Sequence, residues 1–198
     1  MSSYRAAKSG IAADTQAKIR SKYDPELASQ CMHWINEILK EGGDSMRVNT
    51  DGSDESVSSQ LRDGLILCKV MNVLTPGSIP AGKLTKAQTL PFKQMELIGL
   101  FVTKIKEYGI PDYDCFQTVD LHEAQNMHQV ILTLQTLGRK AGTHGHYGFG
   151  PKESEANVRH FTEEQLKSGQ NVIGLQMGSN KGASQAGMTF GKARMIND

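Results

Sequence analysis

The sequence is poor in cysteine and holds no apolar run long enough to cross a membrane. Its three cysteines, Cys31, Cys68 and Cys115, are 37 and 47 residues apart, so they form no C-x-x-C pair of the kind that binds zinc or cycles between thiol and disulfide. No run approaches the roughly 18 apolar residues of a membrane-spanning helix, and the N-terminal segment lacks the apolar core of a secretory signal. We therefore expect a soluble cytoplasmic protein with no membrane or nucleic-acid partner.

The chain also has little net charge, but the charge is unevenly distributed. The formal net charge is +1 over 198 residues. Residues 1–23 carry five basic residues and one acidic residue, a net charge of +4, whereas residues 24–140 carry −4 and residues 141–198 carry +1. A basic N-terminal arm therefore precedes an acidic body. Such an arm favours acidic partners, although the bland alternative is a solvated segment with no partner.

Before residue 171, no segment alternates between apolar and polar residues convincingly enough to predict a strand. A weak helix is expected over residues 14–22, and Asp24-Pro25 then begins a strong one, since aspartate caps helix N-termini and proline suits the first turn. Further helices are predicted over 60–74, over 92–108, and from Asn126 to about 137. The first of these three is apolar almost all round, which is typical of a buried central helix. Residues 44–59 are polar and predict a loop. The fold class is therefore all-α, a bundle of four main helices joined by short turns. The first of these helices presents an apolar stripe of Leu27, Cys31, Trp34, Ile35, Ile38 and Leu39.

Beyond residue 140 the composition changes. Four glycines and one proline fall between 142 and 151, which indicates a linker over 141–160. Thr162 and Gln165 then have the spacing of a capping box, with Phe161 and Leu166 placed for a hydrophobic staple, so a short helix should run to about Ser168.

The last segment begins with apolar residues at alternate positions, Ile173, Leu175 and Met177, and continues with small and polar residues punctuated by glycine. It cannot bury enough apolar area to offset backbone ordering of roughly 1–2 kcal/mol per residue, so it should not fold alone. The alternative is a flexible tail.

Two resemblances follow from particular strings. IGLQMGSNKGASQAGM, from Ile173 to Met188, resembles the calponin-type repeat, and DGLILCKVMNVL, PFKQMELIGLFVTKIKEYGI and FQTVDLHEAQNMHQVILTLQTLGR resemble the single calponin-homology domain of calponins and transgelins. One copy of the repeat is typical of a transgelin. The resemblance implies a basic arm over 1–23, a calponin-homology domain over 24–140, a Gly-rich linker and short helix over 141–170, and a calponin-like repeat over 171–198. Two positions depart from the family pattern: Leu97 replaces a usual asparagine, and Lys152-Glu153 replaces paired lysines.

A catalytic site is not indicated. The glycine-rich stretches 145–150 and 187–193 match a phosphate-binding loop only loosely, because the glycine order is wrong in the first and a Ser/Thr after Lys192 is missing in the second. His144 and His146 lack a third metal ligand, and His122 and His128 are expected on helix surfaces. We therefore expect no enzyme activity, cofactor or metal.

The family resemblance implies a non-enzymatic protein that binds filamentous actin, with bundling as a further option, and that belongs to the cytoskeleton. The repeat would supply apolar anchors, Ile173, Leu175 and Met177, and the cations Lys181, Lys192 and Arg194. Because a phosphate would cancel the local positive charge, Ser179, Ser184 and Thr189 are candidate phosphorylation sites. The alternative is a signalling adaptor whose helical domain docks regulatory kinases.

Overall fold

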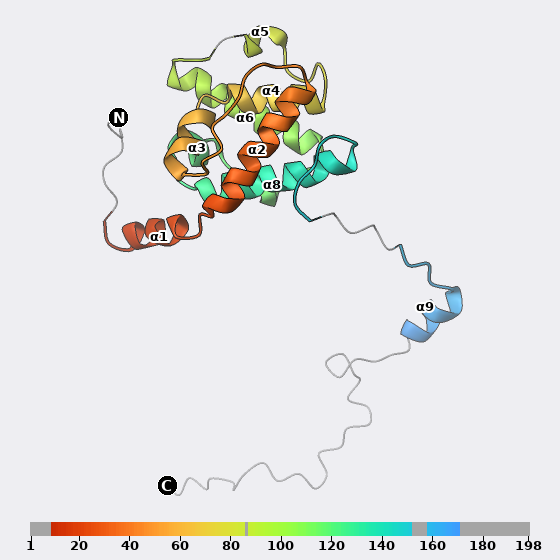
Figure 1. Cartoon of the computed structure of the whole chain (residues 1–198). Coiled ribbons are helices and arrows are strands. Elements are labelled where there is room, and N and C mark those ends of the chain that lie inside the picture. The colour runs from red at the N-terminus through yellow and green to blue at the C-terminus, as the bar shows by residue number, and fades with distance from the viewer. Residues whose placement is uncertain (1–8, 86, 152–157, 171–198) are drawn as a thin grey trace, which may run out of the picture. The chain divides into compact units, whose positions relative to one another are not determined.

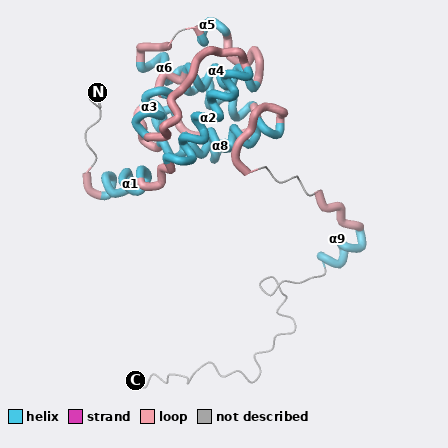
Figure 2. The backbone as a smooth tube through the Cα atoms, in the orientation of Figure 1, coloured by secondary structure: helices cyan, strands magenta, loops and turns pink. Residues whose placement is uncertain are grey.

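A computed structural model describes residues 9–85, 87–151 and 158–170 of the chain (Figure 1). The chain divides into two units, residues 1–154 and 155–198. The described residues form helices, turns and loops and contain no strand (Figure 2). The prediction of an all-α fold is confirmed.

The first unit contains four main helices and several further helical segments. The four that correspond to the predicted main helices are α2 (Pro25–Glu41), α4 (Leu65–Leu74), α6 (Pro91–Glu107) and α8 (Met127–Thr143). The others are α1 (Ile11–Arg20), α3 (Asp54–Leu61), α5 (Ala81–Leu84), the 3₁₀ turn η1 (Asp112–Asp114) and α7 (Thr118–His122). The second unit contains α9 (Glu163–Gln170).

Helix α4 occupies the centre of the bundle, as its nearly continuous apolar sequence predicts. It packs against α6 and α2, and α2 in turn packs against α8 (Figure 1). Seven of its ten residues are buried: Leu65, Ile66, Leu67, Cys68, Val70, Met71 and Leu74. The stripe predicted on α2 also faces this core, and Trp34 is only 1% exposed.

Local capping sets where two of the long helices begin. The Oδ1 atom of Asp24 accepts hydrogen bonds from the backbone N–H groups of Glu26, at 2.9 Å, and Leu27, at 3.2 Å. Asn126 does the same for α8 by accepting from the N–H of Gln129 at 3.2 Å. Both caps satisfy backbone donors that have no partner within the helix, and both were predicted.

The sequence prediction was wrong between residues 44 and 74. Part of the expected loop is α3, and the expected helix over 60–74 is broken before α4. The break falls at Gly64, whose φ of 73° lies in the left-handed region that favours glycine. A Cβ atom at Gly64 would lie 3.0 Å from the backbone nitrogen of Ile98 and 3.1 Å from Cβ of Leu97. The break therefore lets α6 approach the backbone closely, a long-range packing requirement.

Leu97 itself lies in the core. It is 3% exposed, and its carbonyl oxygen accepts a contact of 3.3 Å from Sγ of Cys68 on α4. The expectation that packing takes the place of a polar contact at this family-variant position agrees with its burial.

Candidate functional site: the basic helix and the exit from the bundle

The residues predicted to contact a filament, Ile173, Leu175, Met177, Lys181, Lys192 and Arg194, lie outside the described residues, as do Ser179, Ser184 and Thr189. The described parts that adjoin predicted functional segments are α1 at the start of the chain, residues 144–150 after α8, and α9.

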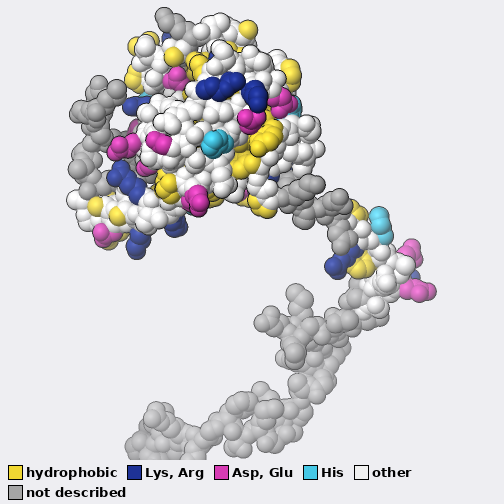
Figure 3. All heavy atoms as spheres, in the orientation of Figure 1, with side chains coloured by type: hydrophobic (Ala, Val, Ile, Leu, Met, Phe, Trp, Pro, Cys, Tyr) yellow, Lys and Arg dark blue, Asp and Glu magenta, His cyan; other side chains and the backbone are white. Residues whose placement is uncertain are grey.

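Helix α1 carries the described part of the basic arm. Its half-buried residues Ala13, Gln16 and Ile19 recur every third position and form one face, whereas Lys18 and Arg20 are exposed. The side-chain amide of Gln16 donates to the carbonyl oxygen of Gln125, near the start of α8, at 2.6 Å. Figure 3 shows Lys and Arg side chains around this helix. The helix therefore contacts the bundle through a half-buried face and exposes its cations to solvent. None of its residues is fully buried.

The turn after α1 is tied to the loop that precedes α3. Tyr23 donates its hydroxyl to the carbonyl oxygen of Gly52 at 3.0 Å. Burial raises the pKa of the Tyr23 hydroxyl, and the neighbouring Asp54 raises it further. Burial also raises the pKa of the Asp54 carboxyl, and the nearby Arg20 partly offsets that shift. The positive charge of Arg20 therefore helps to keep Asp54 ionised.

Residues 144–150, here called the strap, fold back onto α2 and α8. The indole Nε1–H of Trp34 donates to the carbonyl oxygen of Tyr147 at 2.7 Å. The carboxylate of Glu41 lies 2.6 Å from Nδ1 of His146 and accepts from the backbone N–H of Tyr147 at 3.4 Å. The only tryptophan of the sequence is thus covered by the strap.

Close packing holds the second half of the strap. The ring of Phe149 lies 5.8 Å from that of Trp34, centroid to centroid, and a side chain at Gly138 of α8 would overlap the Phe149 ring. A Cβ atom at Gly148 would lie 2.6 Å from Cα of Gly142. The glycines here permit two backbones and a ring to approach closely.

This packing corrects the prediction of a flexible connector from residue 141. Residues 141–143 belong to α8, and the strap is packed on the bundle. The physical reason is that the residues between the glycines make contacts with the bundle. The backbone of Tyr147 forms hydrogen bonds, and the ring of Phe149 buries apolar area. The number of glycines alone does not predict these contacts. The division of the chain into four segments stays a prediction.

Helix α9 has the predicted capping box. The N–H of Thr162 donates to Oε1 of Gln165 at 3.0 Å, and the N–H of Gln165 lies 3.4 Å from Oγ1 of Thr162. The helix ends at Gln170, two residues beyond the expected end. Phe161 and Leu166 are 58% and 53% exposed.

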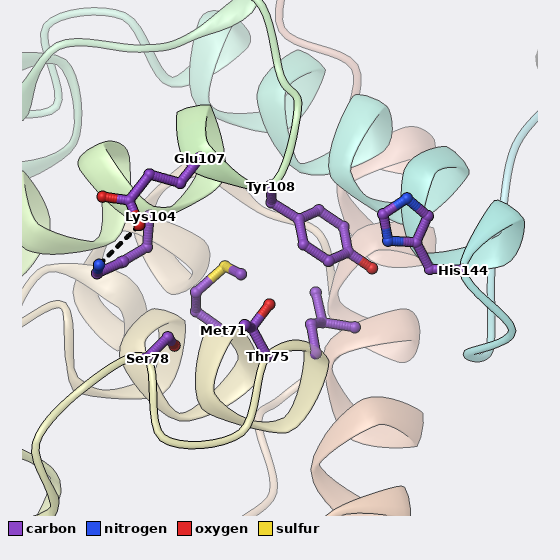
Figure 4. A pocket seen from close by; sticks show the side chains of 8 residues that line it. Met71, Thr75, Ser78, Lys104, Glu107, Tyr108 and His144 are labelled. Carbon is purple, nitrogen blue, oxygen red and sulfur yellow. Dashed lines mark hydrogen bonds and ion pairs between the residues drawn. The ribbon is translucent and has the colours of Figure 1, made fainter.

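A cavity of about 400 Å³ lies between α4, α6 and the end of α8 (Figure 4). Lys104 and Glu107 pair at its edge, with Nζ and Oε2 2.7 Å apart, and the ring of Tyr108 lies 4.5 Å from that of His144. Burial raises the pKa of Tyr108, and Glu41 adds to the rise. Its lining residues are Met71, Leu74, Thr75, Ser78, Lys104, Glu107, Tyr108 and His144.

The described residues bring together no group of three His, Cys, Asp or Glu side chains that could hold a metal ion. Burial raises the pKa of Cys31 to about 12, and that of Cys68 to about 12 with Asp63 adding to the rise, so both thiols stay protonated and poorly nucleophilic. None of the described helices is both long and apolar enough to cross a membrane.

His122 was predicted on a helix surface, and this was wrong, since it is 8% exposed. The side-chain nitrogen of Gln94 donates to the carbonyl oxygen of Gln88 at 2.7 Å, which leaves its Oε1 facing Nε2 of His122 at 3.1 Å. The imidazole Nε2 is therefore the donor, and burial lowers the pKa of His122. Burial of this short α7 against α6 could not be inferred from the five-residue helix alone.

Comparisons with known proteins agree with this architecture. Residues 25–143 match the family model of the calponin homology (CH) domain, and residues 173–196 match that of the calponin family repeat. The fold is similar to that of the CH domain of Rng2 from Schizosaccharomyces pombe, with a TM-score of 0.52 at 24% identity over 76% of this chain and 88% of that one. The helical bundle and the matched repeat together define a protein with one CH domain and one calponin-type repeat.

Full-length relatives narrow the class. The chain is 43% identical over 193 residues to myophilin of Echinococcus granulosus, covering 96% of each. It is 42% identical over 184 residues to muscle-specific protein 20 of Drosophila melanogaster, covering 91% of this chain and 94% of that protein. The chain belongs to the transgelin and calponin family, as the sequence strings predicted.

Proposed function

We propose that this protein is a non-enzymatic, cytoplasmic actin-filament-binding protein of the cytoskeleton, whose C-terminal repeat makes the main filament contact. The observation that carries the proposal is the match of residues 173–196 to the calponin family repeat on the same chain as a CH domain. The names of two relatives, myophilin and muscle-specific protein 20, support a muscle or contractile setting.

The charges of the chain support the same assignment. Residues 171–198 carry Lys181, Lys192 and Arg194 against one acidic residue, a net charge of +2. Lys18 and Arg20 on α1, with Lys22 in the turn that follows, add three exposed cations. An actin filament is acidic in places, so these groups would steer association and lose effect as salt rises.

In this proposal the CH domain is a scaffold or an accessory contact. Its four main helices bury most of their apolar residues in the core. The apolar residues of the repeat, Ile173, Leu175 and Met177, have no helix pattern of their own to bury them. Bundling of filaments would need a second contact per molecule. Among the residues that the structure describes, the basic helix α1 is the candidate for it.

Co-sedimentation with actin filaments tests the proposal. The full chain should pellet with filaments, and a 1–170 truncation should lose most pelleting. Replacing Lys181, Lys192 and Arg194 together by glutamine should weaken binding about three- to 160-fold, since each exposed cation contributes roughly 0.2–1 kcal/mol and every 1.4 kcal/mol is about tenfold. A matched control replaces three exposed lysines of the bundle, Lys40, Lys93 and Lys106, by glutamine.

The outcomes are distinct. Equal weakening by the control variant would show that overall charge, not the repeat, governs binding. Equal pelleting of the truncation and the full chain would move the contact to the bundle or the arm. Failure of both to pellet would contradict filament binding altogether.

A further inference from the structure

Ser21 lies in the exposed turn between α1 and α2, and positive charge surrounds it. Lys18 stands three residues before it, Arg20 directly before it and Lys22 directly after it, and all four residues are exposed. Its hydroxyl donates to the carbonyl oxygen of Lys18 at 2.9 Å, a contact within its own helix end. The nearest following carboxylate, that of Asp24, is occupied in capping α2.

Two other serines, one exposed and one half-buried, have different surroundings. Ser53 donates its hydroxyl to Oδ1 of Asp51 at 2.8 Å and is followed by Asp54 and Glu55. Ser29 is half-buried in α2 and donates to the carbonyl oxygen of Thr50 at 2.6 Å. Basic flanking, exposure and a purely local hydrogen bond therefore coincide at Ser21.

We propose that Ser21 is a phosphorylation site for a basophilic Ser/Thr protein kinase. Kinases select substrates by charge pattern, and an acidic substrate groove is complementary to the cations at these three positions. In the transfer, Oγ of Ser21 attacks the γ-phosphorus of Mg²⁺-bound ATP on the kinase. The Oγ–P bond forms, the bond from γ-phosphorus to the bridging oxygen breaks, ADP leaves with that electron pair, and the Ser21 proton passes to the kinase's base.

The packing of α1 makes the site reachable. A substrate peptide in a kinase groove is extended, so the last turn of α1 must unwind to present Lys18 through Lys22. That unwinding exposes no core, because α1 has no buried residue and touches the bundle by a half-buried face. The opposite holds for Ser29, whose helix α2 carries seven buried residues.

The phosphate would also change what α1 does. It adds a charge of about −1.5 to −2 at a helix C-terminus, where the helix dipole disfavours anions. It also competes with Asp54 for the positive charge of Arg20. Both effects loosen α1 from the bundle and cancel much of the arm's positive charge. Loss of that positive charge would also weaken contact with an acidic filament, and this consequence alone rests on the proposed function.

The test treats the full chain with Mg²⁺-ATP and the catalytic fragment of protein kinase C, and maps phosphate by mass spectrometry. We expect modification of Ser21 at an initial rate at least tenfold above that of Ser53, loss of that phosphopeptide in Ser21→Ala, and an approximately tenfold slower rate at Ser21 in Arg20→Gln. Absence of phosphate on Ser21, an equal rate at Ser53, or no effect of Arg20→Gln would overturn the assignment.

Hydrogen exchange tests the structural consequence without any filament. Amides of α1 should exchange at least tenfold faster in the phosphorylated protein, while those of α2 keep their protection. The Ser21→Ala protein treated with the same kinase is the matched control, since modification elsewhere in the chain is retained. Unchanged exchange of α1 on phosphorylation would contradict the release of this helix even if Ser21 is modified.

Discussion

Removing the Phe149 ring tests whether the strap is an integral part of the bundle. Phe149 is half-buried against Trp34 and Gly138, while the neighbouring Tyr147 uses only its backbone N–H and carbonyl in the contacts with Glu41 and Trp34. Tyr147 as a whole is 55% exposed. Phe149→Ala should therefore undock the strap, and Tyr147→Ala should leave it in place.

The size of the effect follows from the area that the ring covers. A fully buried aromatic side chain removes about 150–250 Å² from water, so a half-buried ring removes roughly 100 Å². At about 25 cal/mol per Å² this contributes about 2.5 kcal/mol, and the pairing with Trp34 adds about 0.5 kcal/mol. We expect Phe149→Ala to lower the free energy of unfolding by about 2–3 kcal/mol, and Tyr147→Ala by no more than about 0.5 kcal/mol.

Urea unfolding followed by tryptophan emission measures both quantities. Trp34 is the only tryptophan, so its emission reports on the strap directly. Loss of the ring should move the emission maximum of the native protein to longer wavelength, because water reaches the indole. Equal stability and equal emission of the two variants would refute the packing argument, whatever their absolute values.

Three further predictions concern the bundle. The pKa of His122 is lowered in the folded state, so as pH falls below about 6.5 the unfolded chain takes up the proton first and stability declines. His122→Gln should make the free energy of urea unfolding less dependent on pH between about 6.5 and 5. An unchanged pH dependence would contradict the burial of His122. Gly64→Ala should lower the free energy of thermal unfolding by at least about 1–2 kcal/mol, because Gly64 has a left-handed φ and contacts α6. Gly99→Ala, in open space within α6, should raise that free energy by up to about 1 kcal/mol. The reverse order would be inconsistent with the described backbone. A thiol reagent should modify half-buried Cys115 before the two buried cysteines, as peptide mass mapping would reveal.

The sequence by itself determined the elements whose causes are local. The caps at Asp24, Asn126 and Thr162 and the apolar stripe of α2 were predicted and are present. A cap needs only partners within about one turn, and a stripe needs only helical spacing, so both are written in consecutive residues.

Only the tertiary structure decided the features that depend on distant partners. Gly64 breaks the helix expected over 60–74 because α6 passes close to it, and His122 is buried because α7 packs against α6. The strap was expected to be a connector, yet Trp34 and Glu41, more than 100 residues earlier in the chain, supply its hydrogen bonds. Composition signals how easily a backbone can bend, but whether it is held depends on which surfaces the remaining helices bring to it.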